Sequence, residues 1–230
     1  MMKISLRPFT AVSSFVFISI VMGSTFLMAR IIVPYLSWRW DVDFLITKQM
    51  IIHLDHYRFS FYAHIFSSGF VLFFGAFLFS PYVLRKCARL HRTLGKLYVG
   101  FILLLSAPSG LVMAFYANGG FWVQLSFIIL APLWWSSTYL GLSAIRRGDI
   151  RKHKKWMIRS YALTLSAISL RAYQTVLGQV EIIEPEYQYL FISWASWIGN
   201  LLIVEFFFLV SKIGVLLNKL RLERIIMKPN

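Results

Sequence analysis

Six long apolar stretches decide which folds are open to this sequence. A helix needs about 20 consecutive apolar residues to cross a lipid bilayer. The stretches are long enough to do so, and they cover residues 8–29, 59–84, 94–117, 121–145, 156–180 and 187–210. Because a strand with an unpaired edge cannot sit in lipid, we interpret all six as helices. The sequence therefore predicts an all-α, polytopic integral membrane helix bundle with six transmembrane helices, forming a single membrane domain over residues 1–230.

The composition excludes an ordinary soluble protein. Only 14% of the residues are charged and 58% are hydrophobic, whereas soluble domains carry about 25% charged residues. The formal net charge is +15, and a strongly basic chain can indicate a nucleic-acid partner. Here, however, the cations flank apolar stretches, and no soluble fold is available to present them. We therefore expect the lipid bilayer, and not nucleic acid, as the partner.

The loop charges predict the orientation in the membrane. Lys and Arg gather in residues 85–96, in residues 146–159 and in the tail from Lys212, whereas the turn at 118–120 and the loop at 181–186 contain none. Short loops rich in Lys and Arg stay in the cytoplasm. We therefore predict a multi-pass protein with both termini cytoplasmic. The long outer segment, residues 36–57, is expected to contain an interfacial helix.

Two polar residues in the outer half of the spans are candidates for a shared site. At 1.5 Å per residue, His64 lies about 8 Å and Arg171 about 14 Å below the outer surface. A charge inside a membrane span is costly unless it is paired. We expect Arg171 to face the bundle near His64, in one outer polar cavity. Asn200, or carbonyl groups at kinks expected at Pro108 and Pro132, could supply hydrogen-bond acceptors.

A second group of polar residues lies towards the cytoplasmic side. His91 and His153 stand at the entrances to the third and fifth spans, and Arg159 and Glu205 lie at similar depths. Glu205 is a carboxylate in an apolar span and needs a cation or a proton. We expect these four side chains to converge in one pocket. Arg159 could equally be one of the cations that anchor the loop in the cytoplasm.

The histidines raise the possibility of a cofactor. His91, Gly95 and Tyr98 lie on one helix face, and a histidine beside small residues is what a b-type haem requires. The same pattern also suits plain helix packing. His91, His153 and His64 are therefore candidate ligands of haem b or neighbours of a quinone, and no metal other than haem iron is expected. The single cysteine excludes an intrachain disulfide and an all-cysteine metal site.

Four segments carry a resemblance to a known family. They read YAHIFSSGFVLFFGAFLFS, HRTLGKLYVG, IRRGDIRKHKKWMIRSYALTLSAISLRAY and SWASWIGNLLIVE. Together they resemble the predicted membrane proteins catalogued as domain of unknown function 2306. The resemblance spans about residues 62–205 and implies an integral protein of the bacterial inner membrane, without an assigned reaction. A looser similarity to b561-type cytochromes departs from their four intramembrane histidines, because only His64 lies well inside the outer half.

Three hypotheses for the function follow. The preferred one is a redox membrane protein that binds a b-type haem or a quinone near the cytoplasmic face. The second is a transporter or lipid-handling protein, with Arg171, His64 and Asn200 lining a cavity for a small molecule. The third is a structural or assembly subunit. The chain contains no nucleotide-binding loop, zinc-protease motif or nucleophile elbow, which argues against a hydrolase. Substrate and oligomeric state stay open.

Overall fold

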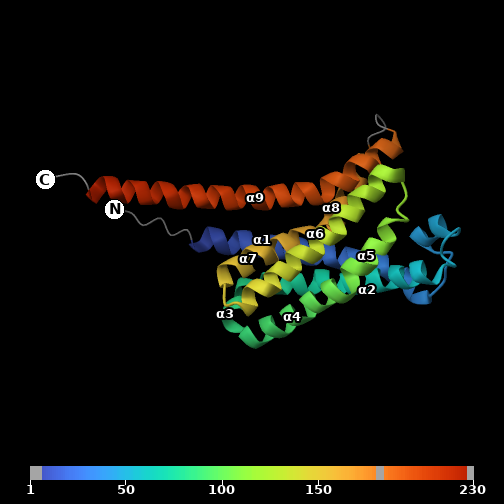
Figure 1. Cartoon of the computed structure of the whole chain (residues 1–230), viewed down its shortest axis with the longest axis horizontal. Coiled ribbons are helices and arrows are strands. Elements are labelled where there is room, and N and C mark those ends of the chain that lie inside the picture. The colour runs from blue at the N-terminus through green and yellow to red at the C-terminus, as the bar shows by residue number, and fades with distance from the viewer. Residues whose placement is uncertain (1–6, 180–183, 227–230) are drawn as a thin grey trace.

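The structure is a computed structural model that describes residues 7–179 and 184–226. Every regular element in these ranges is helical, so the all-α fold is confirmed (Figure 1). In chain order the elements are α1 (Arg7–Ile32), η1 (Val33–Ser37), η2 (Asp43–Lys48), α2 (Asp55–Leu78), α3 (Pro81–Lys86), α4 (Ala88–Phe101), η3 (Ile102–Ser106), α5 (Ala107–Ala114), α6 (Gly120–Arg146), α7 (Ile150–Thr164), α8 (Ser166–Leu177) and α9 (Pro185–Ile226).

Five helical stretches in the described residues are long and apolar enough to cross a bilayer: Ser19–Ser37, Asp55–Leu78, Ala88–Ala114, Gly120–Arg146 and Pro185–Gly214. The polytopic bundle is thereby confirmed, but the expected span at 156–180 is built differently. It consists of two shorter helices, α7 and α8, which meet at Leu165 and together run between the two ends of the bundle (Figure 1). The count of six is therefore approximate: five continuous helices and one broken one.

Hydroxyl side chains explain the break at Leu165. Thr164 Oγ1 donates to the Ser160 carbonyl at 3.0 Å, and Ser166 Oγ donates to the Leu163 carbonyl at 2.6 Å. Such bonds from Ser or Thr to the preceding turn compete with the backbone ladder and bend helices. The break lies where α7 and α8 pass the interior of the bundle.

Prolines change the other spans in different ways. The expected kink at Pro108 takes the form of η3, a π-helical turn over Ile102–Ser106 just before the proline. Pro108 has no N–H to donate to the preceding turn, and a π turn is one way a helix accommodates such a gap. Pro132, in contrast, lies inside a continuous α6. The expected span at 59–84 ends earlier, at Leu78, because Pro81 starts the short helix α3.

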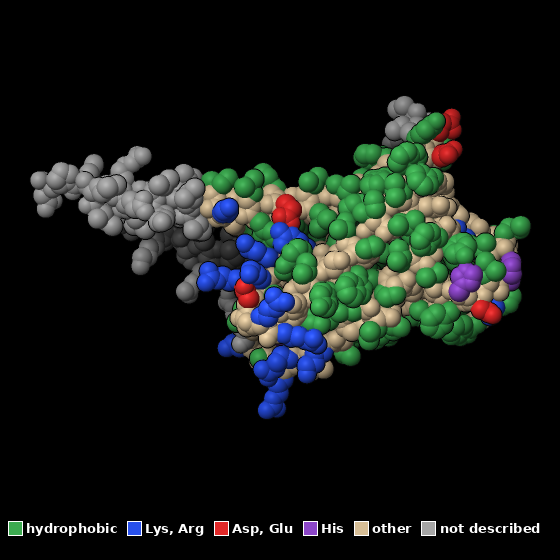
Figure 2. Space-filling model, viewed as in Figure 1, with side chains coloured by type: hydrophobic (Ala, Val, Ile, Leu, Met, Phe, Trp, Pro, Cys, Tyr) green, Lys and Arg blue, Asp and Glu red, His purple; other side chains and the backbone are tan. Residues whose placement is uncertain are grey.

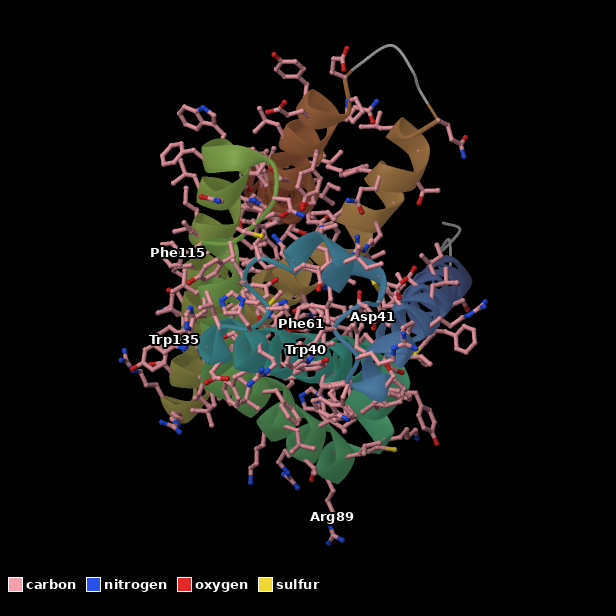
Figure 3. The ribbon with its side chains drawn as sticks, turned by 90° about the vertical axis from the view of Figure 1, so that its right-hand side faces the viewer. Trp40, Asp41, Phe61, Arg89, Phe115 and Trp135 are labelled. Atoms are coloured by element: carbon pink, nitrogen blue, oxygen red, sulfur yellow. The ribbon has the colours of Figure 1, made fainter. Side chains whose placement is uncertain are left out.

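The segment between α1 and α2, residues 33–54, folds back over one end of the bundle, and we call it the cap segment. In place of the expected interfacial helix it contains the two 3-10 helices η1 and η2. Leu45 and Ile52 are buried in it and pack with Tyr57 and Phe61 of α2. Figure 3 looks onto this end, where the cap segment with Trp40 and Asp41 crosses in front of the bundle.

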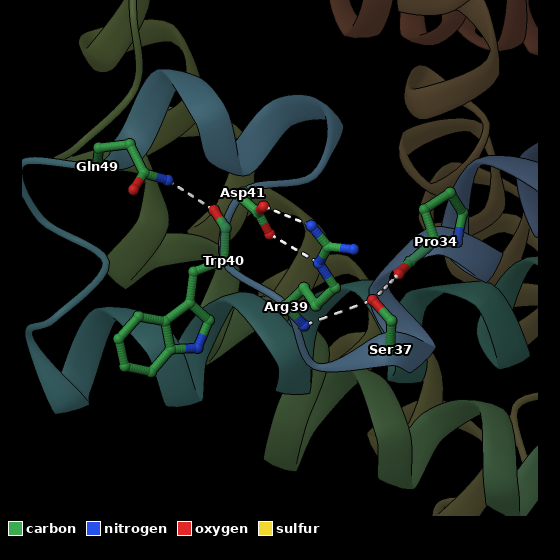
Figure 4. Close-up of polar contacts among 6 residues, drawn as sticks. All are labelled: Pro34, Ser37, Arg39, Trp40, Asp41 and Gln49. Carbon is green, nitrogen blue, oxygen red and sulfur yellow. Dashed lines mark hydrogen bonds and ion pairs between the residues drawn. The ribbon is translucent and has the colours of Figure 1, made fainter.

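Polar contacts fix the exposed part of the cap segment (Figure 4). Arg39 Nε donates to one carboxylate oxygen of Asp41 at 3.0 Å, and Nη2 donates to the other at 2.6 Å. Gln49 Nε2 donates to the Trp40 carbonyl at 2.6 Å, and Ser37 Oγ donates to the Pro34 carbonyl at 2.7 Å. These bonds hold the turn between η1 and η2 in one shape without regular secondary structure.

Charge is distributed unevenly along the bundle. Figure 2 shows Lys and Arg gathered at one end, the end at which α1 starts and towards which α9 runs. Apolar side chains cover the middle, and acidic side chains and histidines appear at the opposite end. We refer to these as the basic end and the cap end. The apolar middle is the part suited to the bilayer.

Candidate functional site

A cavity of about 600 Å³ lies in the cap-end half of the bundle, beneath the cap segment. Its walls come from α1, α2, α5, α6, α7, α8 and the start of α9. Most of the lining is apolar. The polar side chains that line it are Tyr35, Lys48, Tyr57, His64, Ser68, Ser106, Tyr116, Asn118, Trp134, Thr164, Ser166, Arg171, Gln174, Tyr189 and Ser196.

His64 is fixed in the cavity wall by the π-helical turn. Its Nδ1 lies 2.8 Å from the Ser106 carbonyl, the last residue of η3. Since a carbonyl only accepts, Nδ1 carries the proton and Nε2 is left as an acceptor. Gly110 makes room for the ring, because a Cβ at this position would lie 2.8 Å from His64 Cε1. The sequence had suggested that a carbonyl at the Pro108 kink could bind Arg171. In the structure the Ser106 carbonyl, two residues before Pro108, binds His64 instead.

Lys48 of the cap segment covers the side of the cavity that faces the cap end. It is only 3% exposed, and its Nζ donates to the Tyr116 carbonyl and to Asn118 Oδ1. Nζ also lies 5.3 Å from the centre of the Phe44 ring. Burial lowers the pKa of the Lys48 ammonium, as expected for a cation removed from water. The lysine thus ties the cap segment to the turn between α5 and α6.

Arg171 lines the same cavity from α8. Ala167, Leu170, Arg171 and Gln174 all face it, at the spacing of one helix face. Arg171 Nη1 donates to Gln174 Oε1 at 2.9 Å. The side chain is nevertheless exposed, and Ile31 on α1 is 40% exposed while lining the cavity too. The cavity is therefore open between α1 and α8, with Arg171 at the opening.

The cavity contains polar groups whose bonding capacity is unused. The four ion pairs among the described residues join Arg39 to Asp41, Arg58 to Asp55, Lys152 to Asp149 and Arg159 to Glu205. Lys48 and Arg171 are in none of them, and no carboxylate is among the described residues of the lining. Ser68 Oγ is buried without a hydrogen-bond partner in the described structure. Such buried unpaired groups are rare in folded proteins.

Asn200 does not line this cavity. Its amide donates to the Ala162 carbonyl at 3.0 Å, and its Oδ1 accepts from Ser169 Oγ at 2.9 Å. These bonds tie α9 to α7 and α8 on the side away from the cavity-lining face of α8. Of the acceptors that the sequence suggested for Arg171, Asn200 is instead bonded between helices, and no hydrogen bond joins it to Arg171 among the described residues.

The polar residues towards the basic end form two separate pairs. Arg159 Nε and Nη2 donate to the two carboxylate oxygens of Glu205 at 2.5 and 2.8 Å, which joins α7 to α9. His153 Nδ1 lies 2.8 Å from the Gly141 carbonyl, and His91 is near enough to His153 for the two rings to interact electrostatically. Among the described residues no hydrogen bond or ion pair links His91 or His153 to Arg159 or Glu205. The expected single pocket is thus divided, because Arg159 turns outward to α9.

A buried hydroxyl network lies beside the cavity. Tyr98 Oη is 3.0 Å from both Ser160 Oγ and Thr164 Oγ1. Thr138 Oγ1 is 2.7 Å from Ser160 Oγ and donates to the Trp134 carbonyl. Trp134 Nε1 donates to Thr164 Oγ1 at 3.0 Å. Since Thr164 donates to a backbone carbonyl, every hydrogen in the network has an acceptor.

The three candidate haem ligands do not form one site. His64 lines the cavity at the cap end, whereas His91 and His153 lie on α4 and α7 towards the basic end, within range of an electrostatic interaction. The described residues contain no group of three or more His, Cys, Asp or Glu side chains able to hold a metal ion. A haem held by two histidines would need only a pair, so His91 and His153 remain the pair to test.

Comparison with known proteins gives the family. A model of the family described as predicted membrane protein (DUF2306) matches residues 61–208, which is more than half of the 230 residues. The chain belongs to this family. The searches of curated proteins and of solved structures found no match. The DUF2306 match contains His64, Ser68 and Arg171, whereas Lys48 and the cap segment precede it. The family description specifies a membrane protein and no reaction.

Proposed function

We propose that this protein binds a small amphipathic molecule in the cavity beneath the cap segment, as a transporter or a lipid-handling protein. The main observation in support of this proposal is the cavity itself. Its volume of about 600 Å³ falls within the range of about 300–1,000 Å³ that is usual for small-molecule sites. Its mainly apolar lining with a few polar groups is also usual for such sites.

The position of the opening supports a ligand that comes from the membrane. The cavity opens between α1 and α8, where Ile31, Ala167 and Arg171 are exposed and line it. These residues belong to the apolar bundle and not to the cap segment. A molecule dissolved in the bilayer can reach such an opening without crossing water.

The broken helix supports movement of the ligand. Leu163, Thr164, Ser166 and Ala167 flank the break at Leu165, and all four line the cavity. Membrane transporters commonly place their substrate beside discontinuous helices. A joint between α7 and α8 lets α8 change the width of the opening without disturbing the packing of α7 against α6.

Binding can be tested on the purified full chain in phosphatidylcholine nanodiscs. A bound amphiphile should raise the melting temperature in a concentration-dependent manner. Hexadecanoate and a monoacylglycerol phosphate are suitable probes. Ala167→Trp should remove the effect by filling the opening, while Ala172→Trp, equally exposed on α8 but not lining the cavity, should keep it. No shift with any amphiphile, or an unchanged shift in Ala167→Trp, would contradict the proposal.

A redox function is the second candidate, on one specific observation. The Gly141 carbonyl fixes the His153 ring through Nδ1, in the way that backbone carbonyls orient metal-ligating histidines, and His91 lies nearby. A visible absorption spectrum of the purified protein tests this. A haem Soret band that His153→Ala abolishes and His56→Ala leaves intact supports it; a spectrum without haem bands rules out bound haem.

We also propose the orientation that the loop charges predict, with the basic end in the cytoplasm, the cap end outside and α7–α8 as the sixth crossing. Reporter fusions after Asn118 and after Glu184 should signal from the outer side of a bacterial inner membrane. A cytoplasmic signal at either position would contradict this orientation.

A further inference from the structure

We infer that the ligand of this cavity carries an acidic head group, a carboxylate or a phosphate, on an apolar body. The inference rests on the proposed function, since it names the ligand class of the same cavity. Four observations support it: two cations without an ionic partner among the described residues, a described lining that contains no carboxylate, spare N–H donors of Arg171 at the opening, and an apolar interior.

The charged side chains in the described lining of the cavity are both cations. Lys48 and Arg171 are the charged side chains in its described lining, and neither is in an ion pair with a described residue. Among the described residues, Lys48 donates to two neutral oxygens, those of Tyr116 and Asn118, which supply no compensating charge. Isolated charges in a low-dielectric environment are costly unless something pairs with them. An anion in the cavity would remove that cost.

The donors at the opening match an oxyanion. A guanidinium has five N–H donors in a fixed fork, and Arg171 uses one of them on Gln174 among the described residues. Ser68 also lines the cavity, and its buried Oγ has no hydrogen-bond partner among the described residues. Carboxylate and phosphate groups provide several acceptor oxygens and form the strongest such bonds with arginine. A neutral quinone could accept from the same donors but would leave both positive charges unbalanced.

The interior suits an apolar tail. Leu72, Phe127, Leu130 and Leu163 line the cavity from α2, α6 and α7. These side chains offer no hydrogen bonds, so the part of the ligand that contacts them has to be hydrocarbon. An acidic lipid, either a free fatty acid or a phosphate-bearing lipid, combines this tail with the required head group.

Matched pairs of ligands test the inference on the unmodified protein. Hexadecanoate is compared with hexadecanol, and a monoacylglycerol phosphate with the same monoacylglycerol, by titration in phosphatidylcholine nanodiscs. Each acidic ligand should bind about tenfold or more tightly than its neutral partner, because hydrogen bonds to charged groups are worth that much in affinity. Whichever acidic ligand binds more tightly identifies the head group as carboxylate or phosphate.

Variants then assign the preference to the two cations. In Arg171→Gln combined with Lys48→Gln, the preference for the acidic ligand should fall to about threefold or less. Arg147→Gln, which removes an exposed cation at the basic end, is the matched control and should keep the full preference. If the double variant does not fold, the ligand pairs measured on the unmodified protein still decide.

The outcomes separate this inference from the proposed function. If the neutral ligands bind as tightly as the acidic ones, the cavity is a binding site but the acidic head group is wrong. If the double variant keeps the full preference, the two cations are not the recognition element and the inference is likewise overturned. If no ligand of either kind binds, the proposed function itself fails.

Discussion

Two polar regions lie side by side in this bundle and differ in how far their hydrogen bonds are satisfied. The hydroxyl network around Tyr98 is buried between α4, α6 and α7, and every hydrogen in it has an acceptor. The cavity beneath the cap segment contains Ser68 without a partner and Arg171 with one bond among the described residues. Thr164 and Trp134 belong to both regions.

This contrast separates polar groups that stabilise the bundle from polar groups that can bind a ligand. A fully satisfied network rigidifies the structure and offers nothing to a ligand. Hydrogen-bond donors in a cavity that have no partner add no hydrogen bond to the fold and are free to bind a ligand. Substitutions in the network should therefore change stability, and substitutions in the cavity should change binding.

Tyr98→Ala should have the largest effect on stability. The side chain is 0% exposed, and removing a buried aromatic ring costs about 3–5 kcal/mol of unfolding free energy. Tyr98→Phe keeps the ring and loses only the hydroxyl contacts, at a cost of about 1 kcal/mol. Reversible unfolding in mixed micelles measures both. An equal loss in the two variants would mean that the network, and not ring packing, dominates.

Two glycines of the bundle compare the packed core next to the hydroxyl network with the wall of the cavity. A Cβ at Gly75 would lie 2.0 Å from Tyr161 Cε2, and that ring is stacked against Phe79. Gly75→Ala should therefore cost about 1–3 kcal/mol of unfolding free energy through overpacking. Gly110→Ala pushes against His64, which can yield into the cavity. We expect it to weaken ligand binding with a smaller change in stability. Equal destabilisation by both would contradict the comparison.

Two serines, one from each region, test the comparison through single hydroxyl groups. Ser160→Ala removes hydrogen bonds to Tyr98 and Thr138, and each lost bond should cost about 1 kcal/mol. Ser68→Ala removes a hydroxyl that has no partner in the described part of the chain, so stability should stay within about 0.5 kcal/mol or improve. Chemical denaturation of the two variants measures the difference. A destabilised Ser68→Ala would show that its hydroxyl is bonded after all.

The burial of Lys48 predicts a small dependence of the unfolding free energy on pH. Burial lowers the pKa of its ammonium below the ordinary 10.5, so between the lowered pKa and 10.5 the unfolded chain binds a proton that the folded chain has lost. The unfolding free energy must then rise with pH in this window. Subtracting the same curve for Lys48→Met isolates the effect. A difference that is flat or falls with increasing pH would contradict the burial of Lys48.

The sequence was sufficient for the fold class and for most of the spans. Long apolar stretches leave a membrane chain little choice but helices, and α6 over Gly120–Arg146 lies within one residue of its expected bounds at each end. The helix ends beside Pro81 and the joint at Leu165 were missed. The first depends on a proline that ends one helix and starts the next, and the second on hydroxyl side chains that bond to backbone carbonyls. The length of an apolar stretch reveals neither effect.

The site was harder to predict because its members come from distant parts of the chain. Depth along a helix was enough to expect His64 and Arg171 on one cavity. It could not show that Asn200 turns to Ser169, since that depends on the rotation of α9. Nothing in the sequence singled out Lys48 within the long outer segment, residues 36–57. The apolar residues around it, such as Leu45 and Ile52, were the available sign that this loop folds back and buries it.

Trp134 stands in the wall that the cavity and the hydroxyl network share. Its indole N–H is held by Thr164, while the side chain lines the cavity. The chromophore is therefore fixed in orientation, and the medium beside it changes with the contents of the cavity. The protein thus has a built-in optical reporter: a hydrocarbon chain entering the cavity should shift the part of the fluorescence emission that Trp134→Phe removes.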